Sequence, residues 1–221
     1  MNPTQQPLVL GYWKIRGLAQ QIRFLLEYLE VPYKDELYEQ GDGPTFSIDE
    51  WTNAIPSLGM LFYNLPYLKD GEFKFSESDA ITRYIIRKFG NGKNLEGKTL
   101  EDFALVEQMA GILKDIKAEI NDCCYETGDV NKLRSSISEE FGAIVKFLGD
   151  KKFLVGDYVT YVDFIFYEQN ELLQHVTKDH FDNFPSFKAY NERVASLGQI
   201  NKYLKSERNI FTRFNNKCAK I

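Results

Sequence analysis

The sequence predicts a mixed α/β domain followed by an all-helical domain, and three observations support this. The first part of the 221-residue chain contains short apolar runs on either side of an amphipathic segment, as strand–helix–strand units do. A polar, glycine-rich stretch, GNGKNLEGK, follows at residues 90–98. Beyond it the apolar residues recur at helical spacing. We therefore expect an α/β domain at residues 1–90, a linker at residues 91–99 and a helical domain at residues 100–221.

The first strand and helix of the α/β domain are expected within the segment LVLGYWKIRGLAQQIRFLLEYL, residues 8–29. Its first three residues suit a buried strand that ends at Gly11, a residue without Cβ. One helical face then carries Leu18, Ile22, Leu25, Leu26 and Leu29. The solvent side is expected to carry Gln20, Gln21, Arg23 and Glu27. Tyr12 and Trp13 would then lie between a strand end and a helix start, where open α/β sheets bind ligands, although rim packing also fits this position.

The rest of the α/β domain contains a second strand, a long loop, a hairpin and a helix. Residues 33–38 suit a strand, and residues 39–63 are expected to be mostly loop. Two short runs flank Asp70-Gly71, the strongest hairpin signal in the chain. Pro66 at the start of the hairpin suggests an edge, a bulge or a cis bond. A helix is expected to begin near Ser76, with a serine cap. The hairpin makes the predicted sheet mixed, with helices packed against it.

The helical domain is predicted from periodicity and from helix-start signals. Two apolar faces indicate long helices, and they comprise Phe103, Val106, Ala110, Leu113, Ile116 and Ile120, and then Leu133, Ile137, Phe141, Ile144 and Leu148. Thr160 and Asp163 form an N-terminal capping box before a nearly all-apolar helix, which we expect to be the buried centre of this domain. Pro185 suits the first turn of a further helix.

Composition excludes several classes of function. The net charge of −5 argues against nucleic acid as the main partner, and no apolar run is long enough to span a membrane. The N-terminus lacks the basic and apolar regions of a signal peptide. Three cysteines without a paired framework fit a reduced, cytoplasmic compartment. His175 and His180 are the only histidines, which argues against a multi-histidine metal site, and we expect both at the surface.

Three separated segments carry a resemblance to a known family. LGYWKIRGLAQQIRFLLEYLEVPY, NLPYLKDGEFKFSESDAITRYI and FPSFKAYNERVASLGQINKYLKS together resemble cytosolic glutathione transferases, most closely the mu class. The similarity extends from about Leu8 to Ser206, and the loop GDGPTFSIDEW is similar to the loop that sets the mu class apart. The resemblance implies a thioredoxin-like domain that binds glutathione and a helical domain that shapes a pocket for a hydrophobic electrophile. It implies glutathione as co-substrate, no other cofactor, no metal and a role in detoxification.

The resemblance also implies roles for residues that would hold glutathione. Tyr12 matches the catalytic tyrosine whose hydroxyl faces the glutathione sulfur, and Trp13 and Trp51 match residues beside the tripeptide. The backbone of Leu65 would pair with the glutathione backbone. The remaining matches are Asn64 and the cis-proline Pro66 beside Leu65, Glu77 and Ser78 at the γ-glutamyl end, and Asp115 reaching in from a partner subunit.

Further matches concern the electrophile and the dimer. Tyr125 matches a tyrosine on the electrophile side, with Ile15 and Leu18 across from it. Phe62 matches a phenylalanine that inserts into the partner of a homodimer, and an aromatic run in a loop fits that role. Each assignment has a structural alternative. Ser78 fits a helix cap, Tyr125 a core position and Asp115 a surface acid.

Elementary acid–base chemistry agrees with the role of Tyr12. A thiol with a pKa of ~8.5 is only ~3% ionised at pH 7, whereas the thiolate is the nucleophile. A phenol with a pKa of ~10 stays protonated and can donate to the sulfur. Two alternatives to conjugation remain open, which are a non-catalytic carrier of apolar ligands and a glutathione-dependent isomerase. The sequence does not identify the electrophile.

One departure from the mu-class pattern concerns the glycine carboxylate of glutathione. The basic residues that pair with it in the class are replaced by Ile48 and Ile55, and residues 39–68 contain no lysine or arginine. Glu39, Asp42, Asp49 and Glu50 are acidic instead. We therefore predict weak glutathione binding that Ile55→Lys improves. Alternatively, Lys14, Arg16 or a partner-subunit lysine supplies the missing cation.

Overall fold

A computed structural model describes residues 7–221, which group into two compact units. The first unit contains the residues up to Asn91 together with Ser206–Cys218. The second contains Gly92–Lys205 and Ala219–Ile221. The sequence-based boundary assigned all of residues 100–221 to the helical domain, whereas Ser206–Cys218 belongs to the first unit. Ion pairs explain this difference, because Arg208 and Arg213 of this segment bind Glu27 and Glu39.

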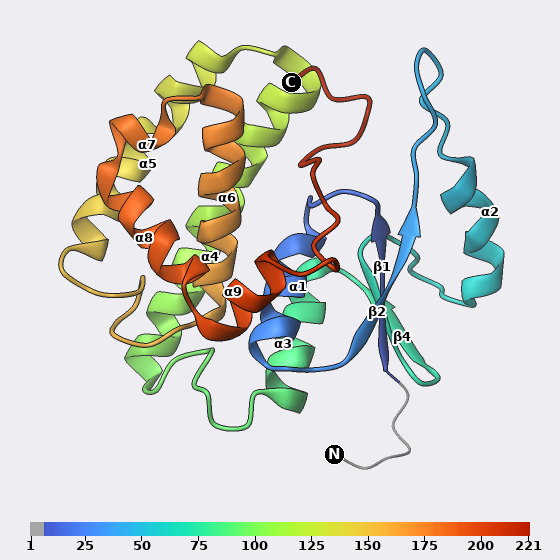
Figure 1. The fold of residues 1–221 in the computed structure, drawn as a ribbon, viewed down its shortest axis with the longest axis horizontal. Coiled ribbons are helices and arrows are strands. Elements are labelled where there is room, and N and C mark those ends of the chain that lie inside the picture. Colours follow the sequence, from blue (N-terminus) through green and yellow to red (C-terminus); the bar gives the residue numbers. More distant parts are fainter. Residues whose placement is uncertain (1–6) are drawn as a thin grey trace. The chain divides into compact units, whose positions relative to one another are not determined.

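The first unit is built on a four-stranded mixed sheet with the order β2-β1-β3-β4. The strands are β1 (Leu8–Trp13), β2 (Tyr33–Tyr38), β3 (Tyr67–Asp70) and β4 (Phe73–Ser76). β1 is parallel to β2 and antiparallel to β3, which pairs antiparallel with β4. The helices are α1 (Ala19–Tyr28), α2 (Asp49–Leu58) and α3 (Ser78–Phe89). α1 and α3 cover one face of the sheet and α2 lies on the other (Figure 1). The predicted mixed sheet, with its two helices and hairpin, is confirmed.

Two elements of this unit differ from the prediction. β1 extends to Trp13, since Tyr12 and Trp13 pair with Leu37 and Tyr38 of β2, so the aromatic residues end the strand rather than follow it. The stretch expected to be mostly loop contains the ten-residue helix α2. Its first turn carries Asp49 and Glu50, which favour a helix N-terminus, and the left-handed Gly59 ends it.

Arg23 was wrongly placed on the solvent side of α1, because its side chain is fully buried. The guanidinium donates to Asp35 at 2.8 Å and to the backbone oxygen of Ile15 at 3.1 Å. It also lies 3.6 Å from the centre of the Phe211 ring. The C-terminal segment therefore covers this side of the helix. Gln20, also expected in solvent, is buried beside Arg23 and accepts one of its hydrogen bonds.

The second unit is entirely helical. Its elements are α4 (Leu100–Asn121), the π-helix η1 (Asp122–Thr127), α5 (Val130–Leu148), α6 (Tyr161–Thr177), α7 (His180–Asn183), α8 (Pro185–Ala195) and α9 (Gly198–Leu204). α6 carries the largest share of buried residues, and the capping box of Thr160 and Asp163 is present, as predicted. Pro185 begins α8, also as predicted.

His180 is buried, whereas a surface position was expected. Its Nε2 lies 2.9 Å from Oδ1 of Asn170, and its ring packs against Phe141 and Phe184. Burial lowers the pKa of His180 to about 4. The imidazole is therefore neutral at physiological pH and serves as a packed core residue.

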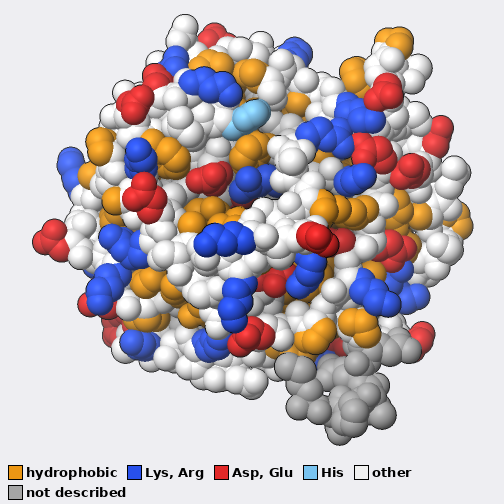
Figure 2. All heavy atoms as spheres, viewed as in Figure 1, with side chains coloured by type: hydrophobic (Ala, Val, Ile, Leu, Met, Phe, Trp, Pro, Cys, Tyr) orange, Lys and Arg blue, Asp and Glu red, His pale blue; other side chains and the backbone are white. Residues whose placement is uncertain are grey.

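Charged and apolar side chains are both present on the surface (Figure 2). Among residues 7–221, every helix is too short or too polar to cross a membrane. Acidic and basic side chains are interspersed on the face shown in Figure 2, with apolar side chains between them.

Candidate active site

Tyr12 at the end of β1 has a hydroxyl group that is held by the backbone of the next segment. The side chain is 6% exposed, and the Leu18 N–H donates a hydrogen bond to its oxygen at 3.0 Å. The oxygen accepts this bond, so the bond does not use the hydroxyl proton. An amide that donates to a hydroxyl oxygen also polarises the O–H bond and strengthens it as a donor.

Gly17 creates the space for that hydroxyl. Its φ is +43°, and a Cβ at this position would lie 2.6 Å from the Tyr12 oxygen and 2.7 Å from Cε1 of the same ring. No side chain can occupy that volume without moving Tyr12. The turn between β1 and α1 is therefore built around the phenol.

A second group of predicted residues meets at the entrance to β3 and the start of α3. The Leu65 N–H donates to Oδ1 of Asn64 at 2.9 Å, and Nδ2 of Asn64 donates to Oε1 of Glu77 at 3.2 Å. The peptide bond before Pro66 is cis, as predicted. A peptide that pairs with Leu65 would take the place of the Asn64 side chain.

Glu77 and Ser78 lie where the chain enters α3. Glu77 has φ +77° and ψ 114°, an unusual conformation for a residue with a side chain, and Ser78 is the first helical residue. Within residues 7–221, no side chain caps this helix. The predicted serine cap is therefore wrong, and the hydroxyl of the first candidate, Ser76, donates to the Phe62 carbonyl at 2.8 Å. An uncapped helix N-terminus suits a carboxylate ligand.

Trp51 is packed into an aromatic cluster rather than lying freely in the loop. Its ring stacks on Tyr67 with 6.1 Å between centroids and meets the edge of Tyr38 at 5.3 Å. The Tyr38 and Tyr67 hydroxyl groups are 2.7 Å apart. Trp13 and Ile55 pack against this cluster while remaining partly exposed. The cluster fixes α2 against the sheet.

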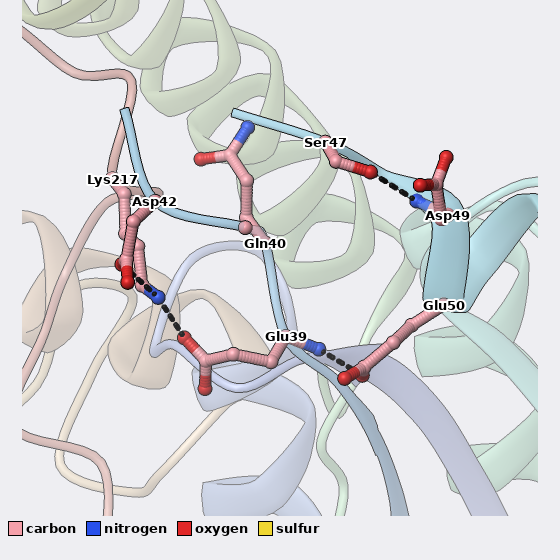
Figure 3. Close-up of a pocket in the computed structure, with 8 residues that line it drawn as sticks. Glu39, Gln40, Asp42, Ser47, Asp49, Glu50 and Lys217 are labelled. Atoms are coloured by element: carbon pink, nitrogen blue, oxygen red, sulfur yellow. Dashed lines mark hydrogen bonds and ion pairs between the residues drawn. The ribbon is translucent and has the colours of Figure 1, made fainter. Parts of the chain in front are cut away.

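The predicted acidic residues line a pocket of about 200 Å³ between the end of β2 and α2. We call this cavity the acidic pocket. Figure 3 shows the polar side chains that line it, which are Glu39, Gln40, Asp42, Ser47, Asp49, Glu50 and Lys217. The Glu39 N–H donates to Oε2 of Glu50 at 2.7 Å, which fixes one carboxylate in place.

Two cations from the C-terminal segment reach these acids, and the sequence analysis did not anticipate either of them. Lys217 lies 2.7 Å from Asp42 and 3.4 Å from Glu39, and Arg213 pairs directly with Glu39. Burial by itself would raise the pKa of Glu39, but the hydrogen bonds and charges of Arg213 and Lys217 outweigh it and lower that pKa. The hydrogen bond and charge of Lys217 likewise lower the pKa of Asp42. Glu39 and Asp42 are therefore ionised at neutral pH and partly neutralised by these two cations.

Comparison with known proteins decides the family. The profile described as glutathione S-transferase, N-terminal domain, matches residues 8–87, and that of the C-terminal domain matches residues 114–207. Glutathione S-transferase Mu 1 of Bos taurus is 38% identical over 206 residues, covering 91% of this chain and 92% of the bovine chain. Mu 7 of Rattus norvegicus is 39% identical with the same coverage. The chain belongs to the glutathione S-transferase family.

Solved structures agree with this assignment. The crystal structure of the glutathione S-transferase Blo t 8 superposes with a TM-score of 0.84 at 26% identity, covering 96% of this chain and 99% of that one. The structure of NaGST-2 gives 0.74 at 30% identity, with 91% and 97% covered. The thioredoxin-like and helical domains are thus confirmed, and the protein is a transferase with glutathione as co-substrate. Neither the carrier nor the isomerase alternative is favoured by these relatives.

The remaining predicted site residues differ in how far they are buried. Ile15 is buried, and Leu18 at the start of α1 is partly buried. Tyr125 is partly buried in η1, and Asp115 is exposed on α4. Phe62 is 81% exposed. Among residues 7–221, no group of three or more histidine, cysteine or acidic side chains is arranged to hold a metal ion.

Proposed function

We propose that the protein conjugates glutathione to hydrophobic electrophiles, with the Tyr12 hydroxyl donating a hydrogen bond to the glutathione thiolate. The observation that carries this proposal is the bond from the Leu18 N–H to the Tyr12 oxygen, because the oxygen accepts this bond and the hydroxyl proton is not used in it. The role needs no general base. The thiolate itself is the nucleophile, and the phenol lowers the cost of forming it.

The required effect is within reach of one charge-assisted hydrogen bond. Lowering the thiol pKa by ~2 units corresponds to about 2.7 kcal/mol, which matches such a bond. Tyr12→Phe keeps the ring that fills the space beside Gly17 but removes the donor. We expect the variant to bind glutathione with a thiol pKa about one to two units higher. Ultraviolet absorption of bound glutathione against pH measures the thiolate, and an unchanged thiol pKa with unchanged turnover would refute the assignment.

We propose that the backbone and the γ-glutamyl end of glutathione bind at the entrance to β3 and the start of α3. The cysteinyl carbonyl of glutathione accepts the Leu65 N–H, and Asn64 moves aside to bind the tripeptide. The γ-glutamyl carboxylate lies at the N-terminus of α3 and accepts from Ser78, where the helix dipole favours an anion. The Glu77 carboxylate faces the γ-glutamyl ammonium. Support comes from the uncapped α3 and from the Asn64–Glu77 contact, which brings these groups together.

We propose that the glycine end of glutathione lies beside Trp13 and Trp51, near a loop whose charge disfavours it. Four acids line the acidic pocket, whereas Arg213 and Lys217 neutralise only part of this charge. The cations that pair with these acids, Arg213 and Lys217, come from the C-terminal segment. Ile55 packs against the Trp51 cluster, so a lysine there must leave that cluster to reach a carboxylate. Ile48 is 44% exposed and carries no such packing role.

We propose that Tyr125 acts on the electrophile rather than on glutathione. It lies in η1, and π-helical turns frequently occur at functional sites. The hydroxyl group of this partly exposed residue can stabilise negative charge that develops on the electrophile or limit product release.

We propose a homodimer in which Phe62 is the anchor. Leu61 and Phe62 are 84% and 81% exposed, and Tyr63 is 52% exposed, so three successive apolar side chains face solvent in a single chain. The hydrogen bond from Ser76 to the Phe62 carbonyl holds this loop on β4. Asp115 would then reach the site of the neighbouring subunit. Phe62→Ala should yield monomers at micromolar concentration in sedimentation, and a dimer that tolerates this change would contradict the proposal.

We propose a cytoplasmic location and a role in detoxification. The three cysteines form no disulfide, and two of them, Cys123 and Cys124, are buried as packing thiols. A reduced compartment fits this state. Cell fractionation tests the location, and recovery of the protein from a membrane or secreted fraction would contradict it.

A further inference from the structure

The end of the long helix that leads to Tyr125 has an unusual hydrogen-bond pattern. α4 continues directly into η1, where the Gly128 N–H donates to the Cys123 carbonyl at 2.8 Å, an i to i+5 bond. The last carbonyls of any helix have no partner within the helix, and a π-turn is less common than an α-turn. Something outside η1 must therefore satisfy the carbonyls around Tyr125.

Lys220, near the C-terminus, supplies both donors. Its backbone N–H donates to the Cys124 carbonyl at 2.7 Å, and its ammonium group donates to the Glu126 carbonyl. These two acceptors flank Tyr125 directly in the sequence. The Lys220 stem also runs beside Gly128, within 4.0 Å of where a Cβ would lie there. The ammonium lies at the negative end of the helix dipole, where a cation is favourable.

The opposite side of η1 is fixed by burial. Cys123 and Cys124 are 2% and 0% exposed, so their side chains anchor the turn in the core of the second unit. Asp122 at its start pairs with Lys132 of α5 at 3.1 Å. With the inner side packed, Lys220 is the group on the outer side that binds the two carbonyls next to Tyr125.

We infer that Lys220 is a positioning residue for the electrophile step, because it holds η1 in its π register and thereby fixes the direction of the Tyr125 side chain. An exchange between i to i+5 and i to i+4 bonding rotates the side chains of a turn about the helix axis. Without the two bonds from Lys220, the outer side of η1 is free to make that exchange. This inference rests on the proposed role of Tyr125, and it adds the residue through which that role is controlled.

Lys220→Met keeps the aliphatic stem and removes the ammonium donor. With a chlorodinitrobenzene as the electrophile, we expect kcat to change about two- to fivefold, in the same direction as in Tyr125→Phe. KM for glutathione and the pKa of the bound thiol should stay at their wild-type values, because both report the first unit. Lys220→Arg should restore kcat, and Lys188→Met, an exposed lysine of α8, is the matched control.

Two further measurements separate the inference from the role of Tyr125. In the Tyr125→Phe background, Lys220→Met should change kcat no further, whereas additive effects would overturn the inference. Amide hydrogen exchange of residues 122–128 should accelerate in Lys220→Met and not in Lys188→Met, and unchanged exchange would also overturn it. If Tyr125→Phe itself leaves kcat unchanged, the proposed role of Tyr125 fails, whereas faster exchange would still show that Lys220 holds η1.

Discussion

Replacing Gly17 by alanine tests whether the active site depends on the present position of Tyr12. The new Cβ would lie 2.6 Å from the Tyr12 oxygen, a separation that non-bonded atoms do not tolerate, so the ring must shift. The φ of +43° adds a backbone cost of roughly 1–2 kcal/mol. Leu18, whose N–H binds the Tyr12 oxygen, is the next residue and would move as well. We expect a folded protein in which the hydroxyl no longer reaches the glutathione sulfur.

The magnitude follows from the thiol equilibrium. If Tyr12 lowers the thiol pKa from ~8.5 to ~6.5, about half of the bound glutathione is thiolate at pH 6.5. Loss of the hydrogen bond leaves about 1% as thiolate at that pH. Turnover limited by the thiolate should therefore fall roughly 50-fold at pH 6.5 and recover towards pH 9.

The assay is ultraviolet absorption of bound glutathione against pH, combined with turnover at the same pH values. Gly59→Ala is the matched control, because Gly59 also has a positive φ, +62°, but no atom lies within 4 Å of its Cβ position. It carries the backbone strain without the contact to Tyr12. A wild-type thiol pKa in folded Gly17→Ala, or an equal shift in Gly59→Ala, would refute the reasoning.

Three other outcomes are expected. Arg213→Gln removes one of the two cations that pair with Glu39, and it should weaken glutathione binding about two- to fivefold, more strongly at low salt, as calorimetry at two ionic strengths can measure. Binding that is unchanged at low salt would contradict this. Ile48→Arg adds a cation at an exposed position and should tighten glutathione binding. The gain should be larger than in Ile55→Lys, because Ile55 packs against the Trp51 cluster. If both variants bind glutathione no more tightly than wild type, the glycine carboxylate already has its cation. His180 has a pKa of about 4 in the folded state against ~6.5 in the unfolded chain, so the unfolded chain binds the extra proton. The free energy of unfolding should therefore fall by about 3 kcal/mol in total as the pH drops from ~6.5 to ~4. His180→Gln should reduce this pH dependence in denaturant titrations, and an unchanged pH dependence would refute the lowered pKa of His180.

Local patterns allowed most of the secondary structure to be predicted. The strands β2, β3 and β4, the hairpin at Asp70-Gly71 and the capping box at Thr160 depend on residues close together in the chain. Periodicity and turn chemistry report such short-range preferences directly. α2 was missed because turn residues and Pro56 obscured a helix whose acidic first turn was nevertheless visible in the sequence.

Some features of the candidate site could be inferred from the sequence, whereas others required the structure. The roles of Tyr12, Leu65 and Ser78 were inferred from the family resemblance, and the structure shows the local hydrogen bonds and backbone around each residue. The hydrogen bond to Tyr12 and the Cβ-sized space at Gly17 required coordinates, because both depend on how the turn between β1 and α1 closes.

Most of the secondary-structure elements and the family to which the motifs point could be predicted from the sequence, because both are properties of residues close together in the chain. Only the tertiary structure decided which distant groups meet. Arg23 appeared to face solvent until the C-terminal segment covered it, and Lys217 reaches Asp42 from 175 residues away in the chain. Such pairings follow from folding of the whole chain, since the free energy of burying or pairing a charge depends on partners that no local pattern specifies.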